Sequence, residues 1–214
     1  MTLFQLTPAD REKGFTLGEM LVAVAILGLI MAGLLSIWMT GNTSYLTGIN
    51  QVQAQENARV ALDRIARDIR GAGFNPRQAA AFNVPIVGSG VCPNNNVPTA
   101  TAFMVINDNS ADGAIQNTEC ILYVLNGANL DRQDFSVDAA PLTVIGGVQA
   151  LTLIYFDQAG TQLNFPPAAV PAASVPLIRS IQINITTQPE TLPGSWQAGA
   201  VAVTMSDRIR LRNQ

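Results

Sequence analysis

The feature that most constrains this chain is an apolar run of 25 residues, from Phe15 to Met39, whose only ionisable side chain is Glu19. As an α-helix, a run of this length extends roughly 37 Å, more than the ~30 Å hydrocarbon core of a bilayer. The sequence therefore predicts one membrane-spanning helix over residues 15–39. A carboxylate inside it is unexpected, because a charged group at mid-bilayer depth costs on the order of 2–3 kcal/mol or more.

The residues before the run are also unusual for a secreted protein. A charged cluster, Asp10 to Lys13, is followed by Gly14 and then directly by the apolar run. An ordinary cleaved signal peptide has an apolar segment of about 7–15 residues with a small-residue cleavage site after it. Here the run is too long for that. An ordinary membrane anchor fits the length but gives no reason for Glu19.

The stretch "KGFTLGEMLVAVAILGLI" resembles the class III signal of type IV prepilins and of type II secretion pseudopilins. The resemblance implies that residues 1–14 are a leader peptide, which prepilin peptidase removes after Gly14. It also implies that Phe15 becomes a methylated N-terminus, and that Glu19 pairs with the α-amino group of Phe15 on a neighbouring subunit, a buried ion pair that sets register. The alternative is a Glu19 that lies near the membrane interface and is solvated there.

A second helical pattern follows the membrane segment and continues the helix over residues 40–73. Arg59/Asp63 and Arg64/Asp68 are spaced as i,i+4 pairs, which we expect on exposed faces. Gly71, Gly73 and Pro76 end the helix. An apolar stripe at three- and four-residue spacing is formed by Val52, Ala58, Ala61, Leu62, Ile65, Ala66 and Ile69. The segment "QENARVALDRIARDIRGAGF" is similar to the one that follows the anchor in PilW-type minor pilins and, more loosely, in J-type pseudopilins.

Residues 74–214 predict a β-rich globular head. Alternating apolar and polar residues, as in Ile181, Ile183 and Ile185, are typical of half-buried antiparallel strands. We therefore expect an α+β fold, in which the long N-terminal helix packs with its second half on a C-terminal antiparallel β-sheet, as in pilins. The predicted strands are residues 102–106, 120–125, 142–157 with a break at Gly146-Gly147, 177–187 and 199–212.

Composition argues against several kinds of chemistry. The chain has no histidine, which removes the commonest general base and zinc ligand, and its net charge is −3 without a basic tract. We find no nucleophile–base pattern and expect neither an enzyme nor a cofactor. The two cysteines, Cys92 and Cys120, predict one disulfide, with two unpaired buried thiols as the alternative.

Two further groups of residues invite a binding role. The segment "NDNSADG" partly matches a calcium-binding loop: with Asp108 in the first position, Gly113 falls at the sixth and Glu119 at the twelfth, but the third is Ser110. We expect ordinary turns over Asp108–Asp112 and assign no metal. Arg208, Arg210 and Arg212 alternate near the C-terminus and could contact acidic partners or DNA, although solvated charge at a strand edge is the simpler reading.

Taken with the resemblance, these patterns predict a PilW-type minor pilin, with a J-type minor pseudopilin of a type II secretion system as the alternative. The resemblance implies a single-pass protein of the bacterial inner membrane with a periplasmic head, later transferred to a cell-surface fibre (a fimbrium). Its expected partners are prepilin peptidase, the inner-membrane assembly platform, and the other major and minor pilins. Adhesion, twitching motility and DNA uptake are all roles that the family fulfils.

Overall fold

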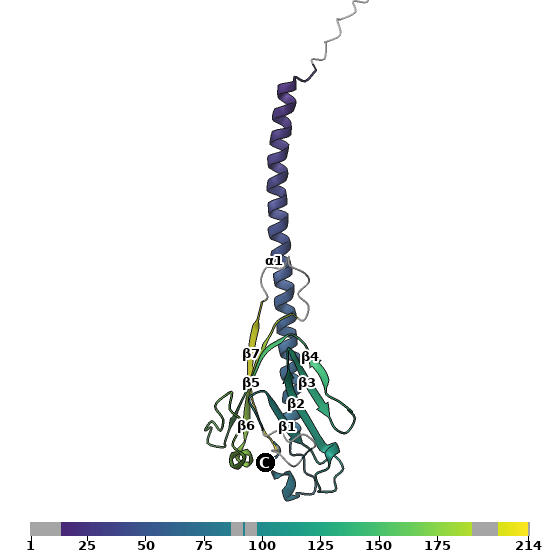
Figure 1. Ribbon diagram of the computed structural model, residues 1–214, viewed down its shortest axis with the longest axis vertical. Coiled ribbons are helices and arrows are strands. Elements are labelled where there is room, and N and C mark those ends of the chain that lie inside the picture. The colour runs from purple at the N-terminus through teal and green to yellow at the C-terminus, as the bar shows by residue number, and fades with distance from the viewer. Residues whose placement is uncertain (1–13, 87–91, 93–97, 190–200, 214) are drawn as a thin grey trace, which may run out of the picture. The chain divides into compact units, whose positions relative to one another are not determined.

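The computed structural model describes residues 14–86, 92, 98–189 and 201–213 (Figure 1). The chain divides into two compact units, Met1–Tyr45 and Leu46–Gln214. One helix, α1 (Leu17–Gly71), belongs to both and confirms the predicted long helix, with its last residue two positions before the predicted end at 73. The predicted leader up to Lys13 lies outside the described residues.

The first unit consists of the apolar part of α1. Residues 14–44 are exposed on every side, including Leu21, Ile26 and Leu34, each more than half exposed. By length and composition this part of α1 is able to cross a membrane. The helix continues through Gly41 and Gly48, where the sequence suggests weak points, and the space around both glycines is open.

The second part of α1 buries one face in the head. Its buried residues follow the three- and four-residue spacing of one helical stripe and are mostly small: Asn50, Ala54, Ala58, Ala61, Leu62, Ile65, Ala66 and Ile69. The alanines let the sheets come close to the helix backbone; for example, the Thr187 hydroxyl donates to the Ala54 carbonyl at 2.6 Å. The prediction was wrong for Val52, which is 55% exposed because it lies on the opposite side of the helix from Ala54.

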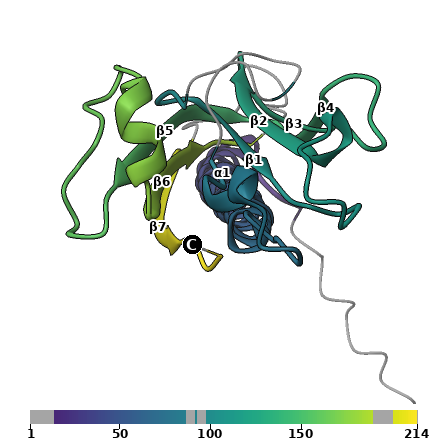
Figure 2. The same ribbon diagram turned by 90° about the horizontal axis from the view of Figure 1, so that it is seen from below.

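The head contains two antiparallel sheets where the sequence predicted one. The first has the order β1-β2-β3-β4 and the second the order β5-β6-β7. Figure 2 shows the two sheets on different sides of α1, and residues of both belong to the same buried cluster as the helix. The strands are β1 (Ala102–Ile106), β2 (Cys120–Asn126), β3 (Asn129–Asp134), β4 (Leu142–Ile145), β5 (Val148–Phe156), β6 (Ser180–Thr187) and β7 (Val203–Arg210). Short 3₁₀ helices are η1 (Ala80–Asn83), η2 (Asn117–Glu119) and η3 (Ala172–Leu177).

The predicted strands are present, but β3 was missed. Its sequence, "NLDRQD", is too polar to show an apolar alternation. It forms a hairpin with β2, in which Asn126 pairs with Asn129 across a two-residue turn containing Gly127 at φ +61°. A glycine in the first position of this two-residue turn is the sequence signal that could have indicated the hairpin.

A polar cluster joins α1 to the first sheet. Asp68 on α1 accepts a hydrogen bond from the Tyr123 hydroxyl at 2.6 Å and another from Arg132 Nε at 2.8 Å. The expectation that Asp68 lies on an exposed face was therefore wrong: its side chain is only 12% exposed, because β2 and β3 cover it. Burial and the nearby Asp68 charge raise the pKa of Tyr123 well above its usual value, so the phenol stays protonated and donates.

A disulfide closes a second, smaller core. Cys92 and Cys120 are bonded, with 6.2 Å between their Cα atoms, as the sequence predicted. Both cysteines are buried. The apolar residues packed around them are Phe82, Met104, Ile106 and Leu122. The disulfide thus fastens the segment before β1 to the first residue of β2.

Candidate processing and assembly site

The residues that the prepilin resemblance assigns to processing lie at the start of α1. Gly14, Phe15 and Thr16 precede the helix, which begins at Leu17, and all three are exposed. A β-carbon placed on Gly14 would have no atom within 4 Å, so the Gly14–Phe15 peptide bond is not covered by other described parts of the chain. A protease needs such an accessible, non-helical bond in order to bind it in extended form.

Glu19 is bound to the first turn of its own helix. Its Oε2 accepts hydrogen bonds from the backbone N–H and the hydroxyl of Thr16, both at 2.9 Å. In return, the Glu19 N–H donates to the Thr16 hydroxyl oxygen at 3.3 Å. Thr16 and Glu19 therefore form a reciprocal capping box, which satisfies backbone donors that a helix N-terminus leaves free.

Sequence reasoning missed this role of Glu19. The pattern Thr-x-x-Glu directly before an apolar run is a recognised signal for a helix start, and Thr16 to Glu19 has that pattern. The capping box also places the carboxylate at the positive end of the helix dipole, where a negative charge is favoured. Before cleavage, Glu19 thus has partners within its own chain.

Cleavage after Gly14 would add a positive α-amino group at Phe15, one residue before the cap residue Thr16. A cation at a helix N-terminus is disfavoured by the dipole unless a carboxylate offsets it. The geometry therefore brings the three predicted site residues, Gly14, Phe15 and Glu19, together in one short segment. The structure shows Glu19 as a local cap, and its pairing with an α-amino group stays a prediction.

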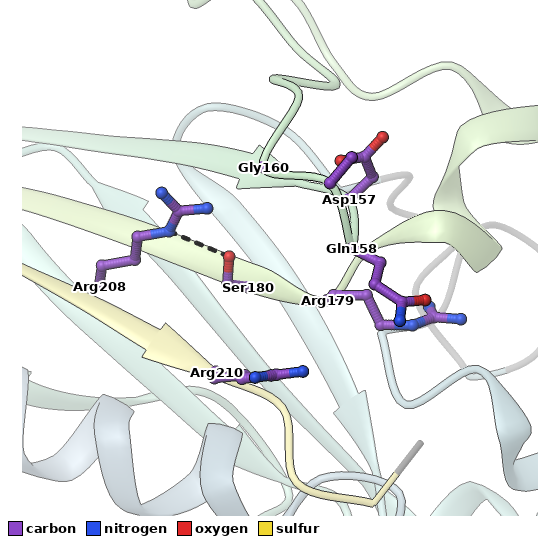
Figure 3. Close-up of a pocket in the computed structure, with 8 residues that line it drawn as sticks. Asp157, Gln158, Gly160, Arg179, Ser180, Arg208 and Arg210 are labelled. Atoms are coloured by element: carbon purple, nitrogen blue, oxygen red, sulfur yellow. Dashed lines mark hydrogen bonds between the residues drawn. The ribbon is translucent and has the colours of Figure 1, made fainter.

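The C-terminal arginines lie at the exposed edge strand of the second sheet. Figure 3 shows Arg208 and Arg210 of β7 at a hollow that Arg179 also lines. Arg208 donates to the Ser180 hydroxyl at 3.1 Å and lies over the Phe156 ring at 3.9 Å, and Arg179 donates to the Pro176 and Ile178 carbonyls. These contacts hold two of the guanidinium groups in fixed positions.

Arg212 lies beyond the end of β7 and lines a neighbouring hollow together with Arg70 of α1. The strand therefore brings the three predicted arginines to one surface, as the alternation indicated. Their charge also keeps the free edge of β7 from pairing with another strand. Chemically, this surface is able to bind an anionic group.

Comparison with known protein families gives a match in the N-terminal segment. Residues 10–35 match the family model of the prokaryotic N-terminal methylation motif. No curated protein matches the chain. The matched residues include the end of the leader, Gly14, Phe15, the capping box and the first part of α1. The match supports a type IV pilin-like protein, a pilin or pseudopilin that prepilin peptidase processes and that assembles with other pilins.

Proposed function

We propose that this chain is a PilW-type minor pilin, which is cleaved after Gly14 and then assembled into, or at the tip of, a type IV pilus. Before assembly, residues 15–39 anchor it in the bacterial inner membrane with the head in the periplasm. The observation that carries the proposal is the register of the methylation motif on α1, with Gly14 and Phe15 outside the helix and Glu19 in its first turn. The role is structural, and we propose no catalytic activity.

The exposed apolar surface of α1 explains why such a chain needs two successive environments. Side chains on every face of residues 20–39 are exposed, and 14 large apolar ones are more than half exposed. Lipid covers them while the protein is in the membrane. In a fibre, the same side chains pack against the α1 helices of neighbouring subunits, so extraction from the bilayer exposes little apolar surface to water.

Glu19 provides the step that depends on cleavage. In the precursor it caps its own helix through Thr16. After cleavage, the new α-amino group of Phe15 on an adjacent subunit offers a charged partner in a water-free helix bundle. Removing one member of a buried ion pair costs roughly 3–5 kcal/mol. An uncleaved neighbour, which lacks this α-amino group, is therefore a poor partner for Glu19.

The alternative is a J-type minor pseudopilin of a type II secretion system, because the same motif and helix serve both machines. A receptor pilin for DNA is a third candidate, and the arginine surface at Arg208, Arg210 and Arg212 is its only support. This candidate predicts salt-dependent DNA binding that falls when these three arginines are neutralised, and unaltered binding would remove the arginine surface as its support.

The intact mass of the protein, measured from sheared surface fibres and from membranes of the native host, tests the main proposal. We expect a chain that starts at Phe15, carries one added methyl group and lacks two hydrogens because of the disulfide. Its presence in the fibre fraction supports the pilus over the secretion machine. A chain that starts at Met1 and is confined to membranes would contradict both.

Three variants separate the two uses of Glu19. Glu19→Gln keeps an acceptor for the Thr16 N–H but removes the charge, Thr16→Ala weakens the cap but keeps the charge, and Glu19→Ala removes both. We expect both Glu19 variants to be cleaved but absent from fibres, whereas Thr16→Ala is incorporated. If Glu19→Gln enters fibres as the wild type does, the ion pair is not what sets the register.

A further inference from the structure

We propose that the loop from Asp108 to Glu119 binds a calcium ion. One carboxylate oxygen from each of Asp108, Asp112 and Glu119 lies within 4.8 Å of the others. Asp108 and Glu119 are buried, while Asp112 is exposed. Three like charges at this separation repel one another, and more strongly where two of them are removed from water. A divalent cation among them reverses the sign of the interaction.

Asp108 is the residue that ordinary turns do not explain. Its side chain is fully buried, and its Oδ2 accepts a hydrogen bond from the Gly113 N–H at 3.2 Å. Its other oxygen, Oδ1, is also buried and has no hydrogen-bond partner among the described residues. Leaving a charged oxygen in this state costs more than leaving a neutral one, and buried polar atoms are almost always satisfied. A buried, unsatisfied carboxylate oxygen on a member of this cluster is a suitable ligand for a cation.

The order of residues along the loop matches a twelve-residue calcium loop. Asp108, Ser110 and Asp112 occupy the alternate positions one, three and five, Gly113 the sixth and Glu119 the twelfth. The backbone makes the required sharp turn with positive φ angles at Ala111 (+55°) and at Gly113 (+81°). Ser110 is thus a third-position hydroxyl oxygen, and its side chain already contacts Glu119 Oε1 at 2.9 Å.

Hydrogen bonds hold the other two carboxylates in place. Asp112 Oδ1 accepts from the Ala114 N–H at 2.8 Å. Glu119 Oε2 accepts from the Gln116 N–H at 3.0 Å. These bonds fix the positions of both side chains, so little reorganisation is needed when a cation binds.

One basic side chain, Arg77, lies beside the loop and has to be considered as the compensating charge. Its aliphatic carbons lie 3.7–3.8 Å from the position of a β-carbon on Gly113. In the part of the chain that the structure describes, no ion pair joins Arg77 to any of the three carboxylates. Arg77 thus leaves most of the negative charge for a bound ion.

The donor set selects calcium over other metals. Carboxylate, hydroxyl and carbonyl oxygens are hard ligands, and both cysteines are bonded to each other, so zinc and copper find no soft donor. Magnesium requires a near-ideal octahedron and keeps several waters, whereas calcium accepts six to eight oxygens in a flexible loop. Loops of this kind in extracellular modules bind with a Kd of about 10⁻⁴–10⁻³ M.

A bound ion would join several parts of the head. The loop connects β1 to β2, and Glu119 precedes the disulfide-bonded Cys120. The Asp108 N–H donates to the Phe74 carbonyl at 2.8 Å, just after α1 ends. Calcium would thus tie the β1–β2 connection to the end of the helix, and would stabilise the head once it faces a calcium-containing exterior. This inference stands independently of which fibre the protein enters.

The test uses the full chain purified in detergent and has two parts. Calcium binding is titrated by calorimetry, and thermal unfolding is recorded in EDTA and in CaCl₂. We expect binding with a melting temperature that rises in CaCl₂, and at least a tenfold loss of affinity in Asp112→Asn, whose exposed side chain makes misfolding a minor concern. Asp157→Asn is the matched control, because Asp157 Oδ1 also accepts a backbone N–H, from Thr161 at 2.7 Å, outside the cluster.

Asp108→Asn supplies an independent readout. In this variant an amide takes the place of the carboxylate whose Oδ1 is unsatisfied. In EDTA we therefore expect it to melt no lower than the wild type, whereas the rise in melting temperature in CaCl₂ should disappear. The proposal is overturned if CaCl₂ does not bind, if MgCl₂ gives the same shift, or if Asp112→Asn binds calcium as the wild type does. It is equally overturned if Asp108→Asn retains the full calcium response.

Discussion

Replacing Asp68 by alanine should weaken the head more than any other single change on the helix surface. Asp68 is the acceptor for both Tyr123 and Arg132, which come from neighbouring strands of the first sheet. Tyr123 is fully buried and stacks on Phe103 with 5.2 Å between ring centroids, so its hydroxyl has no route to water once its acceptor is gone.

The magnitude follows from the two bonds that are lost. An unsatisfied buried hydroxyl costs about 1–3 kcal/mol, and a hydrogen bond to a charged group contributes about 1.5–3 kcal/mol. Arg132 keeps its ion pair with Asp134, at 3.1 Å, so the loss of stability is smaller than for a buried charge left without a partner. We therefore expect a destabilisation of about 3–4 kcal/mol, or about 6–16 °C in melting temperature for a domain of this size.

The assay is thermal unfolding of the full chain in detergent, followed by circular dichroism of the β-rich head. Asp63→Ala is the matched control, because Asp63 forms an i,i+4 pair with Arg59 on the same helix, with side chains 72% and 79% exposed. It should change stability by no more than about 0.5 kcal/mol. Asp68→Asn, which keeps an acceptor for the Tyr123 hydroxyl, should fall between the two.

A double-mutant cycle checks the reasoning itself. If Asp68 and Tyr123 interact as described, Asp68→Ala combined with Tyr123→Phe should cost less than the sum of the single changes by about 1 kcal/mol or more. Strict additivity, or an Asp68→Ala variant that melts within 2 °C of the Asp63→Ala control, would refute the claim that this cluster anchors the helix to the sheet.

Three further outcomes are expected. Replacing Cys92 and Cys120 by serine should destabilise the head by about 3–4 kcal/mol in the chain-entropy model, measurable as a lower denaturant midpoint, and a change below about 1 kcal/mol would argue that the loop is already ordered. Burial alone would raise the pKa of the Asp134 carboxyl, but hydrogen bonds from its neighbours lower it below its usual 3.8. A lowered folded pKa stabilises the native state only while the carboxyl is ionised, so this contribution to stability is complete above about pH 4 and is lost on further acidification. Asp134→Asn should abolish this pH-dependent loss when melting temperatures are measured across that range. Gly73→Ala should cost about 2–4 kcal/mol, because φ is +73° and the added carbon would lie 2.8 Å from the Asn213 carbonyl oxygen; an unchanged melting temperature would contradict this clash.

Local sequence patterns were enough to recognise the prepilin-like segment, because its residues are close neighbours in the chain. Gly14, Phe15 and Glu19 are recognisable from their order before an apolar helix, and the structure adds that Glu19 binds Thr16, three residues away. The loop from Asp108 to Glu119, which we propose as a calcium site, was hard to interpret from the sequence for a different reason. Its residue order is visible in the sequence, but turns have the same composition, and the buried Oδ1 of Asp108 without a partner appears only when the loop is folded.

The sequence by itself determined the membrane-length helix, its amphipathic continuation, the alternation of Ile181, Ile183 and Ile185, and the availability of one disulfide. These features depend on composition and on periods of two or 3.6 residues, which are properties of neighbouring positions. Only the tertiary structure decided that the strands form two sheets on different sides of α1. It also decided that Asp68 is buried, because Tyr123 and Arg132, 55 and 64 positions away in the sequence, cover it. Contacts between such distant segments leave no periodic trace in either segment alone.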